Sequence, residues 1–323
     1  MPPRAHLNHT IIGPIRRLPA ELITHALSFI TRNQLPTALR VSKTWFTAGA
    51  PLLYSELKLI SLPFSVTKSA LTSVTARDEY SAGVRTVAVH LSDRDEERPA
   101  GASAFQALSL ILNKVLMTTK RLEKLSLPHL PSIYHWLFAD VHLPRLSFFE
   151  VSAYILINAQ AFIGRHTKTI KHLQVTSEWS RTEKAVLAWH QHFDASTVPR
   201  LKNLRTLAVD IHFAPALVRE HAATLRHLAI DDYAEVWHRK DNASALFKET
   251  FAALAKTEKL QHFALRLRST VSVVYLSKLL EWCDSLPLVV TLTLWFCPWA
   301  DCQCVLPRIF DEVCPDLSSP TNR

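Results

Sequence analysis

The side chains of this sequence best suited to acid-base or metal chemistry are its histidines. There are 16 of them, and an imidazole titrates near neutral pH, so it serves enzymes as a general base or a metal ligand. His190, His192 and His221 have no acid or nucleophile at a recognisable spacing, which a catalytic arrangement would require. We therefore expect core, capping or surface histidines, and we predict no catalytic residue.

The cysteines do not form a metal motif. Zinc sites pair thiolates at a spacing such as C-x-x-C, whereas a single residue separates Cys302 from Cys304. We predict no metal site and expect the cysteines to be small buried residues. The chain has five of them, at Cys283, Cys297, Cys302, Cys304 and Cys314.

The glycines are too sparse for a phosphate-binding loop. Such a loop needs several glycines close together, so that backbone N–H groups reach the anion. The chain has only five glycines, and even Gly83 and Gly101, the nearest two, lie far apart. Walker and Rossmann nucleotide sites are thereby excluded, and we predict no cofactor. No G-x-S-x-G, H-E-x-x-H or kinase catalytic loop occurs either.

The formal charge of +9 raises the question of an anionic partner. Its basic clusters are short, for example Arg16-Arg17 and Arg239-Lys240, and lie among acids without interleaved aromatic residues. We expect a solvated surface and no nucleic acid. No apolar run reaches the roughly 18 residues of a membrane span, and no secretory signal is present. The prediction is a chain of the cytoplasm, the nucleus or both, with no membrane contact.

Residues 15–57 carry the clearest structural pattern. Pro19 suits the first position of a helix, and apolar residues then recur over 22–30 at helical intervals. Leu35 and Pro36 begin a second helix, and Ser42 caps a third. We expect Gly49 and Pro51 to end that third helix. Three such short helices form too small a core to stand alone, so Trp45 should be partly buried against the region that follows.

This stretch resembles an F-box, in particular the fungal type. The matching features are L-P-x-E-L at Leu18, an L-P step at Leu35, V-S-K-x-W at Val41 and a closing P-L-L-Y at Pro51. The resemblance implies that ten residues divide between the domain core and the groove of a Skp-family adaptor. They are Leu18, Pro19, Leu22, Leu27, Phe29, Ile30, Leu35, Leu39, Val41 and Trp45.

Beyond the three helices the sequence alternates between strand-like and helix-like segments, which favours parallel strands. Helical patterns cover 103–119, 182–193, 243–255 and 271–283. Strand-like segments of the form Φ-x-x-Φ-x-Φ, where Φ is a large apolar residue, begin at Tyr54, Val84, Leu122, Leu146, Ile170, Leu204, Leu225, Leu260 and Val289.

These segments resemble leucine-rich repeats, although the asparagine typical of such repeats is absent almost everywhere. The predicted fold class is therefore α/β, a small three-helix F-box followed by an irregular leucine-rich-repeat-like β/α solenoid. A compact α/β domain is the alternative. In a solenoid, alternate strand residues would form a concave binding face. The predicted substrate-binding residues on this face are Lys124, Phe148, His172, His227, His262, Arg266 and Trp295.

The predicted organisation is a flexible segment over 1–14, the F-box over 15–57, the repeat-like substrate-recognition domain over 58–314 and a flexible tail over 315–323. The predicted function is that of a non-catalytic substrate-recognition subunit of a Skp/cullin/F-box ubiquitin ligase, acting in ubiquitin-dependent degradation. Its F-box would bind the Skp-family adaptor and through it a cullin, and its repeats an unknown protein substrate. Two alternatives stay open: an F-box-bearing scaffold outside a ligase, and an enzyme on an undetected α/β fold.

Overall fold

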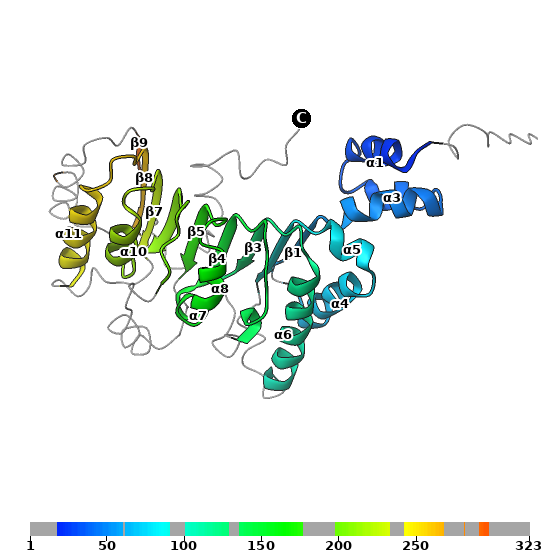
Figure 1. The fold of residues 1–323 in the computed structure, drawn as a ribbon, viewed down its shortest axis with the longest axis horizontal. Helices are drawn as coiled ribbons and strands as arrows, with labels where there is room; N and C mark the ends of the chain where they lie inside the picture. Colours follow the sequence, from blue (N-terminus) through cyan, green and yellow to red (C-terminus); the bar gives the residue numbers. More distant parts are fainter. Residues whose placement is uncertain are drawn as a thin grey trace, which may run out of the picture.

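The computed structural model describes residues 18–60, 62–90, 101–128, 136–176, 198–232, 242–267, 281 and 291–296. In this part of the chain a group of three helices is followed by one long sheet that carries further helices (Figure 1). The predicted terminal segments, 1–14 and 315–323, lie outside the described residues.

The first helices are α1 (Ala20–Ser28), α2 (Leu35–Leu39) and α3 (Lys43–Leu53), which we call the three-helix unit. The carbonyl of Pro19 accepts hydrogen bonds from the N–H groups of Leu22 and Ile23 at 3.1 and 3.2 Å, which starts α1. The Oγ of Ser42 accepts a bond from the N–H of Trp45 at 3.2 Å and caps α3. The structure thus confirms three helices in this stretch and the cap at Ser42.

The predicted end of α3 at Gly49 and Pro51 is wrong, because the helix passes through both residues and continues to Leu53. Gly49 instead allows close packing. A Cβ at this position would lie 2.3 Å from Leu39 Cδ2 and 2.6 Å from Leu27 Cδ1. The glycine therefore lets α1 and α2 approach α3, and it does not act as a turn signal.

The sheet has nine strands, all parallel, and each pairs with the strand that precedes it in the sequence. Each of the nine predicted segments contains a strand, so the predicted strand positions and the parallel pairing are confirmed. The strands are β1 (Glu56–Ile60), β2 (Thr86–His90), β3 (Lys124–Leu127), β4 (Phe148–Ser152), β5 (His172–Thr176), β6 (Thr206–Asp210), β7 (His227–Asp232), β8 (His262–Leu267) and β9 (Thr291–Phe296).

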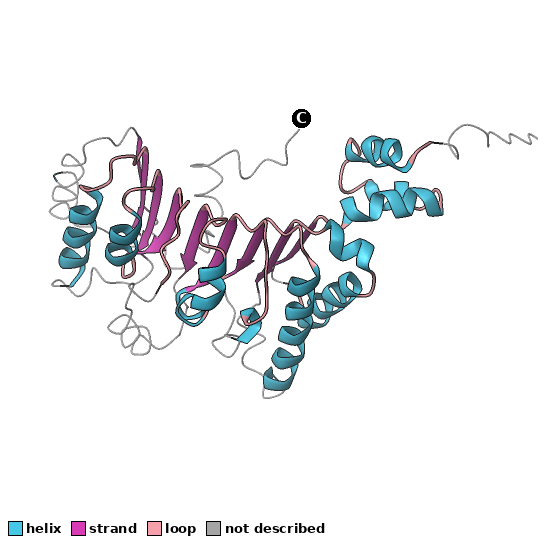
Figure 2. Ribbon diagram, viewed as in Figure 1, coloured by secondary structure: helices cyan, strands magenta, loops and turns pink. Residues whose placement is uncertain are grey.

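Helices connect the strands, and in the view of Figure 2 those between β1 and β5 lie mostly beneath the sheet, while those after β6 lie to its left. Those described are α4 (Phe64–Thr75), α5 (Asp78–Gly83), α6 (Gly101–Thr118), α7 (Ala153–Asn158), α8 (Gln160–Arg165), α10 (Ala214–His221) and α11 (Asn242–Leu254). Helices α6 and α11 confirm the predictions for 103–119 and 243–255. The predicted helix over 182–193 lies outside the described residues, as does that over 271–283 apart from Glu281.

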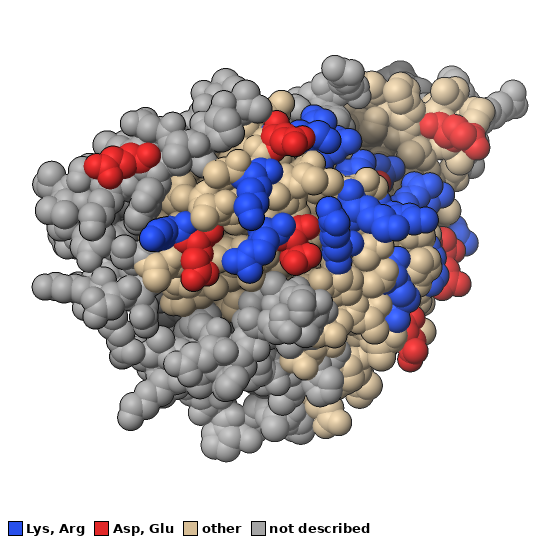
Figure 3. Space-filling view, turned by 60° about the vertical axis from the view of Figure 1, so that its left-hand side comes forward, with Lys and Arg blue, Asp and Glu red and all other residues tan. Residues whose placement is uncertain are grey.

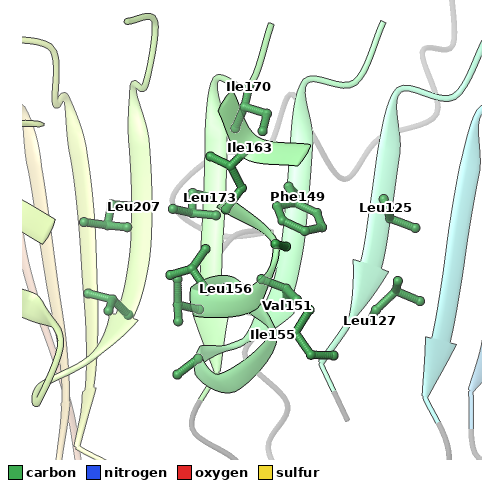
Figure 4. Close-up of a cluster of buried hydrophobic side chains, with 14 of the residues drawn as sticks. Leu125, Leu127, Phe149, Val151, Ile155, Leu156, Ile163, Ile170, Leu173 and Leu207 are labelled. Carbon is green, nitrogen blue, oxygen red and sulfur yellow. The ribbon is translucent and has the colours of Figure 1, made fainter. Parts of the chain in front are cut away.

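One face of the sheet forms the main hydrophobic core together with the helices. Strand residues of the same parity, such as Leu125, Phe149 and Leu173, occupy adjacent positions in the register. They belong to one buried cluster with Ile155 of α7 and Ile163 of α8, as Figure 4 shows. Because side chains alternate along a strand, these residues place the helices on this face, which we call the helix face.

The opposite face of the sheet is also largely buried, and this overturns the predicted fold class. In β5 and β6 every residue after the first is buried, whereas the predicted solenoid would expose every second residue to solvent. The predicted fold class, a small three-helix F-box followed by an irregular leucine-rich-repeat-like β/α solenoid, is therefore wrong. The structure is an α/β arrangement around a single all-parallel sheet, which agrees with the alternative considered from the sequence.

The three-helix unit is joined to the sheet by close packing of α3 against α5. A Cβ at Gly83 would lie 2.6 Å from both the Cα and the carbonyl oxygen of Pro51, so only glycine fits there without a shift. Tyr80 of α5 stacks on Tyr54 with ring centroids 4.4 Å apart and makes an edge contact with Phe46 at 6.2 Å. These contacts hold the two regions together.

An ion pair adds to this junction. The guanidinium of Arg32, between α1 and α2, lies 2.8 Å from Glu56 Oε2 and also donates to the Glu56 carbonyl. Lys58 Nζ lies 3.0 Å from the same carboxylate oxygen. Burial alone would raise the pKa of Glu56, but Lys58 and Arg32 outweigh it, so the pKa is lowered and the carboxylate stays charged.

Candidate protein-interaction surface

The three-helix unit exposes large apolar side chains along α1. Leu18, Leu22 and Phe29 have exposed fractions of 42%, 54% and 73%. Leu18 precedes the N-cap Pro19, whereas Leu22 and the C-cap residue Phe29 lie about two turns apart on one side of the helix. The ring of His25 lies on the same side and meets Phe29 edge-on, with centroids 4.9 Å apart. Val41, directly after α2, is 65% exposed. We call these five residues the apolar surface.

The core of the three-helix unit is filled by other residues. Ile23 and Leu27 of α1 pack against Leu35 and Leu39 of α2 and Ala48 of α3. The side chain of Thr24 ties the helices together, since its Oγ1 donates to Ala20 O at 2.9 Å and lies 3.1 Å from Ala48 O. The apolar surface is therefore not needed to complete this core.

The ten residues predicted to divide between core and adaptor groove do divide in space. Five are exposed, namely Leu18, Pro19, Leu22, Phe29 and Val41, while Leu27, Leu35 and Leu39 are buried, and Ile30 and Trp45 are half-buried against the same core. Sequence reasoning named all of the apolar surface except His25. The ring contact of His25 with Phe29 is the feature that places it there.

The expected position of Trp45 needs a correction. Its side chain packs against the core of the three-helix unit, and the neighbouring Phe46 is the aromatic residue that reaches α5. The indole Nε1 of Trp45 is buried and has no hydrogen-bond partner among the described residues. Burial of Trp45 thus comes mainly from its own unit.

The predicted substrate-binding residues fall on one line of the sheet, apart from two. Pairing places Lys124, Phe148, His172, Thr206, His227 and His262 side by side, and we call this line the outer row. All of the predicted residues in it are half-buried. Arg266 pairs with Trp295 further along the strands, and the placement of their side chains lies outside the described part of the chain. The outer-row side chains are less exposed than freely solvated strand residues would be, and their role in substrate binding stays a prediction.

Two histidines of the outer row, His172 and His227, are held largely in the neutral form by burial. His172 Nδ1 lies 3.0 Å from Thr206 Oγ1, and the rings of His227 and His262 stack with centroids 4.7 Å apart. Burial is the largest cause that lowers the pKa of both His172 and His227 to about 4. Neighbouring charged groups add to it, including Lys171 for His172 and Arg226 for His227.

A chain of buried polar side chains lies beside the outer row. Three of them are two residues further along their strands, and His90 lies two residues past Ala88, the register partner of Ser126. His90 Nε2 lies 2.9 Å from Ser126 Oγ, which donates to a carboxylate oxygen of Glu150. Gln174 Nε2 donates to the other oxygen at 2.7 Å. This buried polar chain, His90–Ser126–Glu150–Gln174, crosses four adjacent strands, β2 to β5, and all four residues are less than 9% exposed.

The carboxyl group of Glu150 is the unusual member of this chain. Burial raises its pKa from 4.5 to about 7, and the hydrogen bond from Ser126 offsets only part of that effect. Ser126 donates its hydroxyl proton to Glu150, and its Oγ lies 2.9 Å from His90 Nε2. Their arrangement fixes strand register, because it pairs polar atoms that would otherwise be buried alone.

Two further histidines act as structural links between turns and helices. His166 Nε2 accepts a bond from the N–H of Leu143 at 2.9 Å, and His221 Nε2 accepts one from Leu201 at 3.1 Å. In each, Nδ1 contacts the carbonyl four residues earlier, at 2.7 and 2.9 Å. Burial lowers the pKa of both rings. The sequence-based expectation of a core or capping role thus fits His221, while His190 and His192 lie outside the described residues.

Among the described residues, no group of three or more His, Cys, Asp or Glu side chains could hold a metal ion. The five cysteines lie outside that part of the chain. No described helix has the length and apolar character needed to cross a membrane. No protein-family model matches the chain, and no curated protein matches it. The F-box resemblance stays a prediction from the residues themselves.

Proposed function

We propose that this chain is a substrate-recognition subunit of a Skp/cullin/F-box ubiquitin ligase whose three-helix unit binds the Skp-family adaptor. The observation that supports it best is the apolar surface of α1 and α2. Four of the eight exposed large hydrophobic side chains found among the described residues, Leu18, Leu22, Phe29 and Val41, gather in this small unit. An apolar group of this kind marks a site of interaction with another protein.

The spacing of these residues favours docking into a groove. Leu22 and Phe29 lie about two turns apart along α1, with Leu18 directly before its N-cap, and a helix that docks into an apolar groove presents side chains at such intervals. Each side chain of this size contributes roughly 1.5–3 kcal/mol when it is removed from water. Several residues that carry the F-box resemblance are therefore exposed apolar side chains that a partner could bury.

The junction between the three-helix unit and the sheet supports a receptor role. Packing of Gly83 on Pro51 and the Arg32–Glu56 ion pair hold the adaptor-binding end at a fixed place relative to the strands. A receptor of this kind would present a bound substrate to the ligase in one orientation. The chain itself then supplies no catalytic group.

The test is co-purification of the adaptor with a variant that carries Leu22→Ala and Phe29→Ala. Both side chains are exposed, so the fold should survive, and adaptor recovery should fall by at least about tenfold. The matched control carries Val66→Ala and Leu110→Ala, which remove exposed apolar side chains from α4 and α6. Equal recovery by the folded variant and the control would refute adaptor binding at the apolar surface.

A second measurement separates the ligase from a scaffold. With the proteasome inhibited, the wild-type chain should recover a cullin together with the adaptor, and the Leu22→Ala, Phe29→Ala variant should lose both. Recovery of the adaptor without a cullin would contradict the ligase and favour an F-box-bearing scaffold.

A further inference from the structure

Three cations stand in line where the strands begin. The residue directly before each strand bonds through its backbone to the corresponding residue of the preceding strand. Arg205 N–H donates to Lys171 O, and Arg226 N–H donates to Arg205 O, both at 2.8 Å. Adjacent strands lie about 4.8 Å apart, so the side chains of Lys171, Arg205 and Arg226 start from points spread over about 10 Å. All three are exposed.

Two further lysines lie in the turns that precede β5 and β6. Lys202 N–H donates to Thr167 O at 2.9 Å, and Asn203 Nδ2 donates to Lys168 O at 2.7 Å, which holds the two turns side by side. Lys168 and Lys202 are exposed as well. We call the five residues Lys168, Lys171, Lys202, Arg205 and Arg226 the basic edge.

The positive charge of the basic edge is not neutralised within the described part of the chain. None of its five residues forms a salt bridge with a described acid, in contrast to Arg32, Lys58 and Arg85. The adjacent His172 adds no positive charge, since its pKa is lowered to about 4. Figure 3 shows Lys and Arg side chains gathered in a band across one side of the molecule, with fewer acidic side chains among them.

We propose that the basic edge binds an acidic segment of a partner polypeptide. Alternate side chains of an extended peptide lie about 6.6 Å apart, so two or three carboxylates on one side of it would reach across the line of Lys171, Arg205 and Arg226. Guanidinium groups bind carboxylates through paired hydrogen bonds. The basic edge is separate from the apolar surface, and this proposal does not depend on adaptor binding.

A protein partner fits this site better than a nucleic acid. Proteins that bind single strands combine cations with exposed aromatic rings on which the bases stack. The exposed large hydrophobic residues found among those described are elsewhere, on α1, α4, α6 and β1 and next to α2. The basic edge offers charge and hydrogen bonds without such a stacking surface.

The experiment measures binding of the full-length chain to a fluorescent ten-residue oligoglutamate peptide by anisotropy at two salt concentrations. Arg205→Glu combined with Arg226→Glu should weaken binding by at least about tenfold at low salt, because two attractive contacts become repulsive. Higher salt should weaken wild-type binding and reduce the difference. Arg205→Gln with Arg226→Gln should give an intermediate loss, which guards against a folding defect in the charge-reversed variant.

The matched control is Lys68→Glu with Lys114→Glu, which changes the net charge equally on exposed positions of α4 and α6. It should weaken binding by less than about threefold if the site is local. An equal loss in the control would overturn the basic edge as the site. An oligonucleotide of equal charge that binds more tightly than the peptide, and loses binding in the Arg205→Glu, Arg226→Glu variant, would overturn a polypeptide as its occupant.

Discussion

The three-helix unit and the sheet place their side chains in opposite ways. The three-helix unit leaves Leu22 and Phe29 in solvent, although its core is complete without them. The sheet does the reverse, because it encloses Glu150 and Gln174 with exposed fractions of 4% and 1%. Neither placement is favourable for an isolated side chain. The proposed adaptor would cover the apolar surface, and hydrogen bonds satisfy the buried groups of the sheet.

The largest difference in stability between the two regions should appear when a phenylalanine in each is replaced by alanine. Phe149 is fully buried in the sheet, whereas Phe29 is 73% exposed. Phe149→Ala should lower the free energy of unfolding by about 3–5 kcal/mol, because it leaves a cavity. Phe29→Ala should change it by less than about 0.5 kcal/mol. Urea denaturation measures both, and similar losses would contradict the distinction between a packed sheet and an apolar surface.

The buried polar chain should make stability depend on pH through Glu150. The folded state raises the pKa of this carboxyl from 4.5 to about 7, so folding favours its protonated form. Its contribution is full below pH 4.5 and is lost as the pH rises to about 7, in total about 3 kcal/mol. Glu150→Gln removes this pH-dependent loss of stability, because glutamine does not ionise. Its amide can still form hydrogen bonds with Ser126 and Gln174.

The measurement is the difference in unfolding free energy between Glu150→Gln and wild type at several pH values from 4 to 8. The unfolding free energy of the variant should increase relative to that of wild type as the pH rises. His172 and His227 have lowered pKa values, so they lower stability as the pH falls, but they do so in both proteins. A difference that stays constant over this range would show that folding does not shift the pKa of Glu150.

A smaller effect is expected at the junction of the two regions. Gly83→Ala would place a methyl group 2.6 Å from the backbone of Pro51, which the backbone must relieve by moving. We expect a loss of about 1–3 kcal/mol in the free energy of unfolding. Gly164→Ala is the control, because its Cβ would meet only Pro199 Cγ at 3.8 Å, and alanine should stabilise α8 by up to about 1 kcal/mol. Thermal unfolding of the two variants compares them directly, and an equal response would contradict tight packing at Gly83.

The sequence predicted the strands well but misjudged the environment of one sheet face. Large apolar residues on the helix face, such as Leu125 and Leu173, repeat at fixed spacing and so locate each strand. On the other face the polar residues suggested solvent. Ala208, Ala229 and Ala264 stand among them at adjacent register positions and are buried. Those alanines were the signal that this face is covered.

The candidate sites were predicted only in part, for a related reason. Helix α1 is apolar around more than half of its circumference, so its sequence alone does not say whether Leu22 or Ile23 faces the core. Packing against α2 and α3 decides it. The basic edge was missed because Lys171, Arg205 and Arg226 are far apart in the sequence and become neighbours only through strand pairing. Their common position directly before a strand was the available clue.

The strand order has a consequence for how the chain would emerge from the ribosome. Every strand pairs with the one synthesised just before it, so no strand must wait for a distant segment. At roughly 5–20 residues per second, a new strand would become available every few seconds and cover the open edge left by its predecessor. That edge, a row of unpaired N–H and carbonyl groups, invites pairing with other nascent chains. Growth in chain order therefore adds only one such edge at a time to the outer edge of β1, because each newly made strand shields the one before it.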